Sequence, residues 1–336
     1  MMQHKSNIPP GLIILLLTAS FFPGYAQPSF KAQAVRFSED NDFINLRGEG
    51  TDRYYTNGTR IDLLYTKSPA RKFPTSLLIP LHEGSDDLYA VGINQLIFTP
   101  SDISNPQVIA GDRPYAGLLF LNHTLVSSDN VNKQKLTTEM DLGVIGPASF
   151  ARETQTFIHR LIHSQKPMGW DNQVKDDIIL NYQIQYEKLL ISPSDKFELI
   201  GLVEADAGTL SNKIAAGLTF RVGRYNSYFS HYEKPGIPIR DGAANSYMKY
   251  QFYFYLKPVL VAFMDNSVLQ GGMFTGYHSV YTIPTDSLTR YYMQFEYGIV
   301  FGIKRFGISV DEKLRTREYK GSQVVQVGNI TLFIGL

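Results

Sequence analysis

Apolar and polar residues alternate along much of the chain after residue 30. In residues 248–258, MKYQFYFYLKP, the even positions are apolar and the odd positions are polar or amphipathic. Successive side chains of a β-strand point to opposite faces of its sheet, so this pattern predicts a strand with one apolar and one polar face. The same alternation recurs in residues 138–144, 182–187, 216–223, 291–303 and 330–336.

Short turn-like stretches separate these segments: SPSD at 192–195, LSNK at 210–213 and IKRFG at 303–307. Such clusters of Gly, Pro, Ser, Asn and Asp favour turns. The candidate segments add up to about 12 or 13 strands, some of them longer than the roughly 5 or 6 residues usual in soluble sheets.

A strand count of this size fits a soluble β-sandwich or barrel, and it also fits a membrane barrel. A soluble barrel would carry Val, Leu and Ile on its buried face. Here the apolar face is rich in Tyr and Phe near the strand ends, and the other face carries Gln, Glu, Thr, Tyr and Gly. An outward apolar band with aromatic girdles around a polar interior is typical of outer-membrane barrels, which in bacteria have even strand numbers. We therefore expect an all-β fold, a transmembrane antiparallel β-barrel of about 12 strands.

One segment departs from the alternation. In residues 147–165, PASFARETQTFIHRLIHSQ, the apolar side chains recur at helical spacing, beside a polar edge that holds Arg152, Gln155, His159 and His163. Pro147 near the start and Pro167 beyond the end bound this helix. We expect one short amphipathic helix inserted between two strands, with its apolar face covering another part of the protein.

The N-terminal residues have the three parts of a secretory signal peptide: His4 and Lys5, an apolar run from Gly11, and the small residues Gly24 and Ala26. The apolar run is shorter than the roughly 20 residues of a membrane-spanning helix. We therefore expect a cleaved signal peptide at residues 1–26 and a single mature domain at residues 27–336.

Composition narrows the classes of function. The formal net charge of +1 gives little support for nucleic-acid binding, and the absence of cysteine excludes disulfides, thiol nucleophiles and thiolate metal sites. The sequence contains no G-x-S-x-G elbow, Walker loop or dinucleotide-binding fingerprint. If the protein is an enzyme, water is a better candidate for the nucleophile than a side chain.

His159 is the first candidate for chemistry, because it lies beside the apolar stripe of the predicted helix without belonging to it. A lone histidine more often serves only in hydrogen bonding, and this interpretation remains open. His159 and His163 form an H-x-x-x-H pair, but Arg160 occupies the position where zinc proteases carry Glu, and a cation there opposes a bound dication.

The second candidate is the stretch 38–60, SEDNDFINLRGEGTDRYYTNGTR. Its Asp and Asn oxygens suit a hard cation such as calcium, although the spacing is not that of an EF-hand. A solvated loop is the alternative, since these residues are ordinary in loops. A third element, DRPYAG at 112–117, is by itself typical of a turn with a local ion pair.

Five motifs occur in order: NDF at 41–43, TDRYYTNGTR at 51–60, DRPYAG at 112–117, GPASFARETQTFIHRLI at 146–162 and RTREYKG at 315–321. Together they resemble the outer-membrane lipid A 3′-O-deacylase family over nearly the whole mature chain. The resemblance implies a 12-stranded barrel in the outer membrane that hydrolyses the ester holding the acyloxyacyl group at the 3′ position of lipid A, with calcium required.

The resemblance also implies a site between the barrel wall and a short helix, near the outer leaflet. The family's Asn-Asp pair falls on Asn41 and Asp42, its histidine on His159 and its hydroxyl residue on Thr56. His159 would then activate water, calcium held by Asp42 and Asn41 would polarise the carbonyl, and Asn41 with Thr56 would orient donors. Glu39 and Asp40 crowd the Asn-Asp pair and depart from the family pattern, which could alter metal affinity.

The phosphates of a lipid A substrate call for cations near the site, and the candidates are Arg53, Arg60, Arg113 and Lys133. We expect lipopolysaccharide and outer-membrane lipids as partners, no nucleic acid, and a monomer. Two other functions remain open: a small non-catalytic porin-like barrel, or another lipid-active barrel such as a phospholipase. A serine phospholipase would need a serine from another strand, because Ser149 and Ser164 each lie about 140° round the helix from His159.

Overall fold

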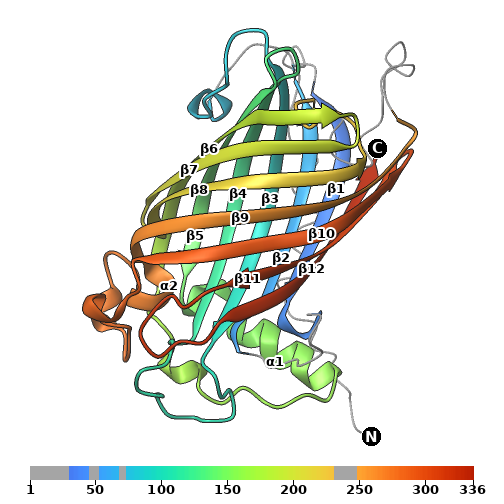
Figure 1. Ribbon diagram of the computed structural model, residues 1–336. Helices are drawn as coiled ribbons and strands as arrows, with labels where there is room; N and C mark the ends of the chain where they lie inside the picture. Colours follow the sequence, from blue (N-terminus) through green and yellow to red (C-terminus); the bar gives the residue numbers. More distant parts are fainter. Residues whose placement is uncertain (1–29, 45–52, 68–72, 231–247) are drawn as a thin grey trace, which may run out of the picture.

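The computed structural model describes residues 30–44, 53–67, 73–230 and 248–336. Twelve antiparallel strands form a closed barrel in which each strand pairs with its neighbours in sequence and β1 pairs with β12 (Figure 1). The predicted twelve-stranded antiparallel barrel is therefore confirmed. The predicted signal peptide lies outside the described residues.

The strands are β1 (Lys31–Asn41), β2 (Tyr54–Thr66), β3 (Asp86–Thr99), β4 (Ala116–Asp129), β5 (Gln134–Ile145), β6 (Asp177–Ser194), β7 (Phe197–Gly208), β8 (Ser211–Arg224), β9 (Tyr250–Asn266), β10 (Tyr291–Ile303), β11 (Phe306–Arg315) and β12 (Val325–Gly335). The predicted strand at 291–303 coincides with β10, and the segments at 138–144, 182–187 and 216–223 lie inside the longer strands β5, β6 and β8. The segment at 330–336 ends one residue beyond β12, and the segment at 248–258 starts two residues before β9, which continues through Pro258 to Asn266.

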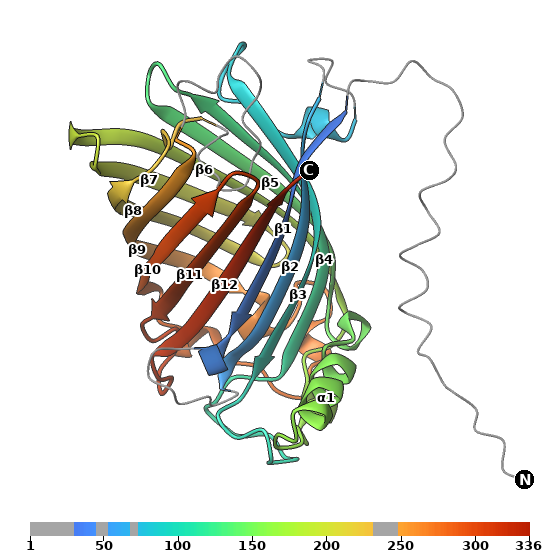
Figure 2. The same cartoon turned by 90° about the vertical axis from the view of Figure 1, so that its right-hand side faces the viewer.

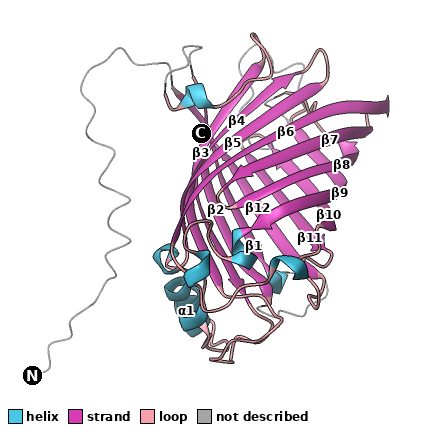
Figure 3. Cartoon of the chain, turned by 90° about the vertical axis from the view of Figure 1, so that its left-hand side faces the viewer, coloured by secondary structure: helices cyan, strands magenta, loops and turns pink. Residues whose placement is uncertain are grey.

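The helical segments are α1 (Ala151–Leu161), α2 (Ser267–Gln270) and the 3-10 turns η3 (Asp42–Ile44), η4 (Thr75–Leu77), η5 (Pro147–Ser149), η6 (Trp170–Asn172), η8 (Gly276–His278) and η9 (Thr285–Ser287). Most of them gather at the α1 end of the barrel (Figure 3). In the described part of the chain, no helix has the length and apolar character needed to cross a membrane.

The outer surface of the barrel is apolar, as the alternation predicts. In β9, Phe252 is 57% exposed, whereas its neighbour Tyr253 is 6% exposed and points inward. The outward side chains of β10 behave in the same way, with Tyr291 68% and Ile299 50% exposed. Exposed Phe, Ile and Tyr on every second residue match a surface that contacts lipid.

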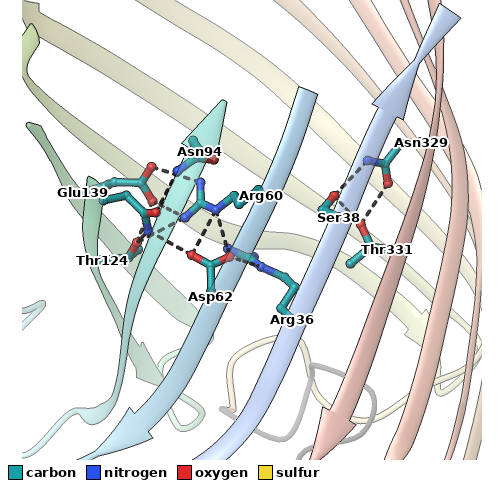
Figure 4. Close-up of polar contacts among 10 residues, drawn as sticks. Arg36, Ser38, Arg60, Asp62, Asn94, Thr124, Glu139, Asn329 and Thr331 are labelled. Atoms are coloured by element: carbon teal, nitrogen blue, oxygen red, sulfur yellow. Dashed lines mark hydrogen bonds and ion pairs between the residues drawn. The ribbon is translucent and has the colours of Figure 1, made fainter. Parts of the chain in front are cut away.

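The lumen is filled by paired charges. Arg36 and Arg60 both contact Asp62, and Arg60 also contacts Glu139 at 2.9 Å, while Thr124 donates a 2.6 Å hydrogen bond to Glu139 (Figure 4). A cavity of about 410 Å³ remains in the lumen, and Arg36, Arg60 and Glu139 are among the residues that line it. Buried charges are tolerated when they are paired in this way, so the lumen is polar.

The two ends of the barrel differ. The C-terminus lies at one end, and α1 lies at the other (Figures 1 and 2). Long connections at the α1 end include residues 100–115, 146–176 and 267–290. Outer-membrane barrels carry their longer loops on the extracellular side. We therefore assign the α1 end to the cell exterior and the outer leaflet.

The predicted helix is present, but the expected direction of its apolar face was wrong. The residues of α1 that face the barrel are Ala151, Gln155 and His159, all at most 5% exposed. Its apolar side chains point away from the described chain, with Phe157 61% and Leu161 65% exposed. An apolar stripe exposed in this way suits contact with lipid, and the polar edge packs on the wall.

Candidate active site

The connection between β1 and β2 fixes the Asn-Asp pair. Asn41 ends β1, and its Oδ1 accepts a 2.8 Å hydrogen bond from the backbone N–H of Phe43. Asp42 begins η3, is 3% exposed, and accepts a 2.9 Å hydrogen bond from the backbone N–H of Arg53. A Cβ atom at Gly328 of β12 would lie 2.5 Å from the carbonyl oxygen of Ile44. The absence of a side chain at Gly328 therefore lets η3 pack closely on the barrel rim.

The two acidic residues before this pair point to opposite sides of the wall. Asp40 lies inside the barrel, where it pairs with Lys313 at 3.1 Å and accepts a 2.8 Å hydrogen bond from Tyr55. Glu39 points outward and accepts a 2.7 Å hydrogen bond from Thr59. Asp40 is therefore part of the lumen packing, while Glu39 belongs to the surface that carries Asn41.

A bulge in β2 brings Thr56 to the same face. The pairing of β2 with β3 shifts between Tyr55 and Asn57, so one extra residue enters β2 at this point. Asn57 lies opposite Asn41 on β1. The hydroxyl of Thr56 is 2.7 Å from that of Thr99 at the end of β3, and both residues are buried. Asn41, Asp42 and Thr56 are thus brought to one rim of the barrel, at the α1 end.

Helix α1 lies against the outer face of β3 and β4 (Figure 2). Gln95 of β3 donates a 2.7 Å hydrogen bond to the carbonyl of Ser149, just before the helix begins. Ala151 packs with Ile97 and Trp170 in a small core between the helix and the wall. These contacts hold the Ala151, Gln155 and His159 face of the helix against the barrel.

His159 is 5% exposed, and its Nδ1 atom is hydrogen-bonded to the backbone carbonyl of Gln165. A carbonyl only accepts hydrogen bonds, so Nδ1 carries the proton. In the neutral ring the lone pair then lies on Nε2. This arrangement fixes the tautomer that a general base requires.

Gln155, on the predicted polar edge of the helix, is a further candidate site residue beyond the predicted ones. It lies one turn before His159 on the same buried face, and its Oε1 accepts a 2.8 Å hydrogen bond from the indole N–H of Trp170. Its buried amide nitrogen has no hydrogen-bond partner among the described residues. The i, i+4 spacing with His159 is the signal that would have identified it.

The predicted substrate-binding cations occupy three different environments. Arg53 lies at the rim, where its guanidinium donates a 2.9 Å hydrogen bond to Gln323. Arg60 lies in the lumen between Asp62 and Glu139 (Figure 4). Lys133 lies in the turn between β4 and β5, at the end of the barrel opposite α1. The structure therefore brings Arg53 to the Asn-Asp pair and places Arg60 and Lys133 away from it.

Arg113 is 3% exposed and is covered by aromatic rings, with its guanidinium 4.9 Å from the centre of Phe98. Its ion partner is Glu318 at 3.8 Å, in the motif at 315–321. The adjacent Asp112 accepts a 3.0 Å hydrogen bond from Tyr319 of the same motif. The motifs at 112–117 and 315–321 are thus about two hundred residues apart in the sequence but in contact in the fold. The sequence predicted a local ion pair between Asp112 and Arg113, whereas Arg113 pairs with Glu318.

Burial shifts the pKa values of two groups in this cluster. It lowers the pKa of the Arg113 guanidinium, with Glu318 acting in the opposite direction. Burial also raises the pKa of the Tyr319 phenol, and the neighbouring Asp112 carboxylate raises it further. The phenol therefore remains a hydrogen-bond donor to Asp112 at neutral pH.

The described residues contain no group of three or more His, Cys, Asp and Glu side chains arranged to hold a metal ion. Asp42 and Asn41 offer a carboxylate and an amide oxygen, which are ligand types that calcium takes, at adjacent positions of the chain. Calcium takes six to eight oxygens. These two residues therefore fit part of a calcium ligand set.

The chain matches the model of the family described as outer membrane protein LpxR over residues 12–336. Among solved structures, LpxR from Salmonella typhimurium aligns with a TM-score of 0.69 and 19% identity, covering 90% of this chain and 100% of that one. The β domain of the Bordetella autotransporter BrkA aligns with a TM-score of 0.41 and 8% identity, covering 91% of this chain and 100% of that one. A search of curated proteins finds no match. The family match spans nearly the whole chain and confirms the family that the five motifs indicate, so this protein belongs to the LpxR family of outer-membrane proteins.

Proposed function

We propose that this protein is an outer-membrane esterase that removes the 3′-linked acyl group of lipid A, with His159 as the base that activates water. Membership of the LpxR family supports a lipid A deacylase in the outer membrane. The observation that carries the catalytic assignment is the position of His159, buried between α1 and the wall with Nδ1 bonded to the Gln165 carbonyl. In the family's substrate, the released group is an acyloxyacyl group.

The chemistry follows from the tautomer. Nε2 of His159 takes a proton from water, whose oxygen attacks the ester carbonyl carbon. When the bond between that carbon and the sugar oxygen breaks, the imidazolium returns the proton to the sugar oxygen. Such general acid–base catalysis contributes about 10²- to 10⁴-fold in rate.

The negative charge that develops on the carbonyl oxygen needs hydrogen-bond donors. Asn41 and Thr56 lie on the rim that carries Asp42, and the buried amide nitrogen of Gln155 lies on the same face of α1 as His159. We propose that the side chains of Asn41, Thr56 and Gln155 donate hydrogen bonds that stabilise this oxyanion. A calcium ion held in part by Asp42 and Asn41 would polarise the ester carbonyl as a Lewis acid.

Arg53 is the cation assigned to the phosphate of the sugar. It is partly exposed at the rim, and its backbone N–H donates to Asp42. An arginine in this position recognises phosphate by paired hydrogen bonds as well as by charge.

The assignment is tested with purified protein incubated with lipid A and, separately, with phospholipid, followed by mass spectrometry of the lipids. His159→Ala should lower the rate of lipid A deacylation by at least about 100-fold. The exposed His163 provides the matched control: His163→Asn keeps a residue that tolerates its positive φ of 56° and should retain full activity. Equal lipid A products from the wild type and His159→Ala would refute the assignment.

The same assay separates the alternatives. Cleavage of phospholipid in place of lipid A would indicate another lipid-active barrel. Addition of a calcium chelator should abolish deacylation, and calcium should restore it. Unchanged activity in the chelator would remove calcium from the proposal and leave the role of His159 intact.

A further inference from the structure

The backbone takes an unusual turn at Tyr54, the first residue of β2. The φ angle of Tyr54 is 72°, and across it the backbone N–H of Tyr55 donates a 3.0 Å hydrogen bond to the carbonyl of Arg53. A hydrogen bond that spans one residue with positive φ defines the rare and strained form of the γ-turn. For a bulky side chain such as tyrosine, this conformation is an outlier.

The other non-glycine residues with positive φ in the described part of the chain lie where left-handed backbone is common. They occur in hairpin turns or at the ends of helical segments: Lys133, Phe150, His163 and Lys304. Hairpin turns and helix caps accept this conformation readily. Tyr54 instead leads directly into a strand, so its strained backbone must be held by something outside the turn.

The side chain of Tyr54 supplies this support. It is 5% exposed and packs with Val325 and Val327 of β12. Its ring lies edge to face with that of Tyr319, at 6.4 Å between ring centres, and the guanidinium carbon of Arg113 lies 5.9 Å from its centre. Strained backbone persists only where the surrounding structure fixes it, and these contacts fix the ring of Tyr54.

Arg113 is itself held by the motif at 315–321. Glu318 of this motif pairs with Arg113 and also accepts a 3.0 Å hydrogen bond from Arg315. The motif therefore supports Tyr54 twice, directly through Tyr319 and indirectly through the ion pair of Glu318 with Arg113.

The turn sets the positions of two candidate site residues. Before it, the backbone N–H of Arg53 donates a 2.9 Å hydrogen bond to Asp42, which orients that carboxylate. After it, Tyr54 pairs in register with Thr99, whose hydroxyl is 2.7 Å from that of Thr56. A different backbone conformation at Tyr54 would move the Arg53 N–H and the Thr56 hydroxyl together.

We propose that Tyr54 is a positioning residue for the reaction, because its side chain holds the γ-turn that orients Asp42 and Thr56. This inference rests on the proposed function and adds a residue to its site. Since the ring is buried, Tyr54 acts through these neighbours. Asp42 and Thr56 are assigned to the charge that develops in the transition state, so loss of the turn should lower kcat more than it changes KM.

The test measures kcat and KM for lipid A deacylation in variants of Tyr54. Tyr54→Phe keeps the ring and should match the wild type. Tyr54→Gly and Tyr54→Leu lose the ring contacts and should lower kcat at least about tenfold, while KM stays within about twofold. Tyr54→Leu still fills space beside Val325 and Val327, so it remains informative if the glycine variant does not fold.

Tyr253→Leu is the matched control. Tyr253 is 6% exposed, its ring lies edge to face with that of Tyr225, and the guanidinium carbon of Arg221 lies 4.4 Å from its centre. Tyr253 is near the start of β9, and this strand reaches the α1 end of the barrel only at Asn266. The substitution removes a similar buried ring away from the candidate site and should change neither kcat nor KM.

A second measurement needs no substrate. The amides of Arg53 and Tyr55 both donate hydrogen bonds that depend on the turn. Their hydrogen exchange, followed by mass spectrometry of the detergent-solubilised protein, should be at least about tenfold faster in Tyr54→Gly and Tyr54→Leu than in the wild type. Tyr54→Phe and Tyr253→Leu should exchange at the wild-type rate.

The outcomes separate this proposal from the proposed function. Unchanged kcat in both Tyr54→Gly and Tyr54→Leu overturns the proposal, because the backbone then keeps the turn without the ring. A loss of kcat without faster exchange, or an equal loss in Tyr253→Leu, overturns it as well. Faster exchange in the Tyr54 variants of a protein whose wild type cleaves no lipid A contradicts the esterase function and leaves the role of Tyr54 in orienting Asp42 standing.

Discussion

A Cβ atom at Gly117 would lie 2.2 Å from the Cβ of Ala151, so strand β4 and helix α1 touch at a residue that has no side chain. The hydroxyl oxygen of Ser149 would be equally close, at 2.3 Å. Neither neighbour is the flexible end of a long side chain. The close approach of helix and wall that buries His159 therefore depends on glycine at position 117.

Gly117→Val should displace α1 and lower lipid A deacylation at least about tenfold, because a shift of about 1 Å in catalytic geometry has effects of this size. Folding of the barrel is checked by its heat-modifiable migration on electrophoresis. Gly201→Ala is the control, since its Cβ would meet only the end of the exposed Leu190 side chain at 3.1 Å. Full activity in Gly117→Val would show that the helix position is not critical.

The hydrogen bond from Trp170 to Gln155 can be followed directly, because the chain has one tryptophan and it is 1% exposed. Gln155→Leu leaves the buried indole N–H without its acceptor, at a cost of about 1–3 kcal/mol. We expect urea to shift the tryptophan emission to the red at a lower concentration than in the wild type. Gln155→Glu keeps the acceptor and should restore the wild-type midpoint, whereas identical midpoints for all three proteins would contradict this role.

His82 lies in the β2–β3 connection, outside the strands, with both ring nitrogens near acceptors: Nδ1 is 2.9 Å from the Glu83 carbonyl and Nε2 is 3.0 Å from Asp129. The backbone hydrogen bond to Glu83 and the Asp129 carboxylate raise the pKa of His82 above its usual value. Because the folded-state pKa is the higher one, this contact stabilises the fold below about pH 6.5 and is lost as the pH rises through the folded-state pKa.

An NMR titration should therefore give His82 a pKa above about 6.5. Asp129→Asn should lower that pKa, while the amide oxygen can still accept from the turn residues Val131 and Asn132. A pKa that does not change in Asp129→Asn would assign the whole shift to the backbone of Glu83.

The ion pairs of the lumen predict a low conductance in planar bilayers. A wide pore needs an open interior, and here Arg60 bridges Asp62 of its own strand and Glu139 of β5 on the inner side of the wall (Figure 4). Replacing Arg60 and Glu139 together by Ala should raise the conductance. Neither partner of this ion pair is then left without the other, and Asp62 keeps its contact with Arg36. Ile61→Ala, on the outward face, should not raise it. A large wild-type conductance would favour the porin-like alternative.

Much of the fold could be predicted because the pattern along each strand reflects its two environments. Strand β10 was predicted with the observed bounds, and the outward positions of β9 are those that the alternation marked as apolar. The predicted strands at 138–144 and 182–187 are shorter than the observed strands β5 and β6. Near the strand ends, apolar and polar side chains no longer alternate, so the sequence pattern does not mark where the strands end. The helix at 147–165 was predicted from its spacing, but the pattern does not say which face meets lipid and which meets the wall.

The alternating strands and the amphipathic helix follow from the amino-acid sequence, and five ordered motifs indicate the family with its candidate residues Asn41, Asp42, Thr56 and His159. The places of these residues and of their neighbours became visible only in the folded barrel. Barrel closure sent Asp40 and Arg60 into the lumen and Glu39 to the lipid face, and it joined Arg113 to Glu318. The physical reason is that alternation is a local property of one strand, whereas the partners of each side chain depend on register and on the helix packed against the wall.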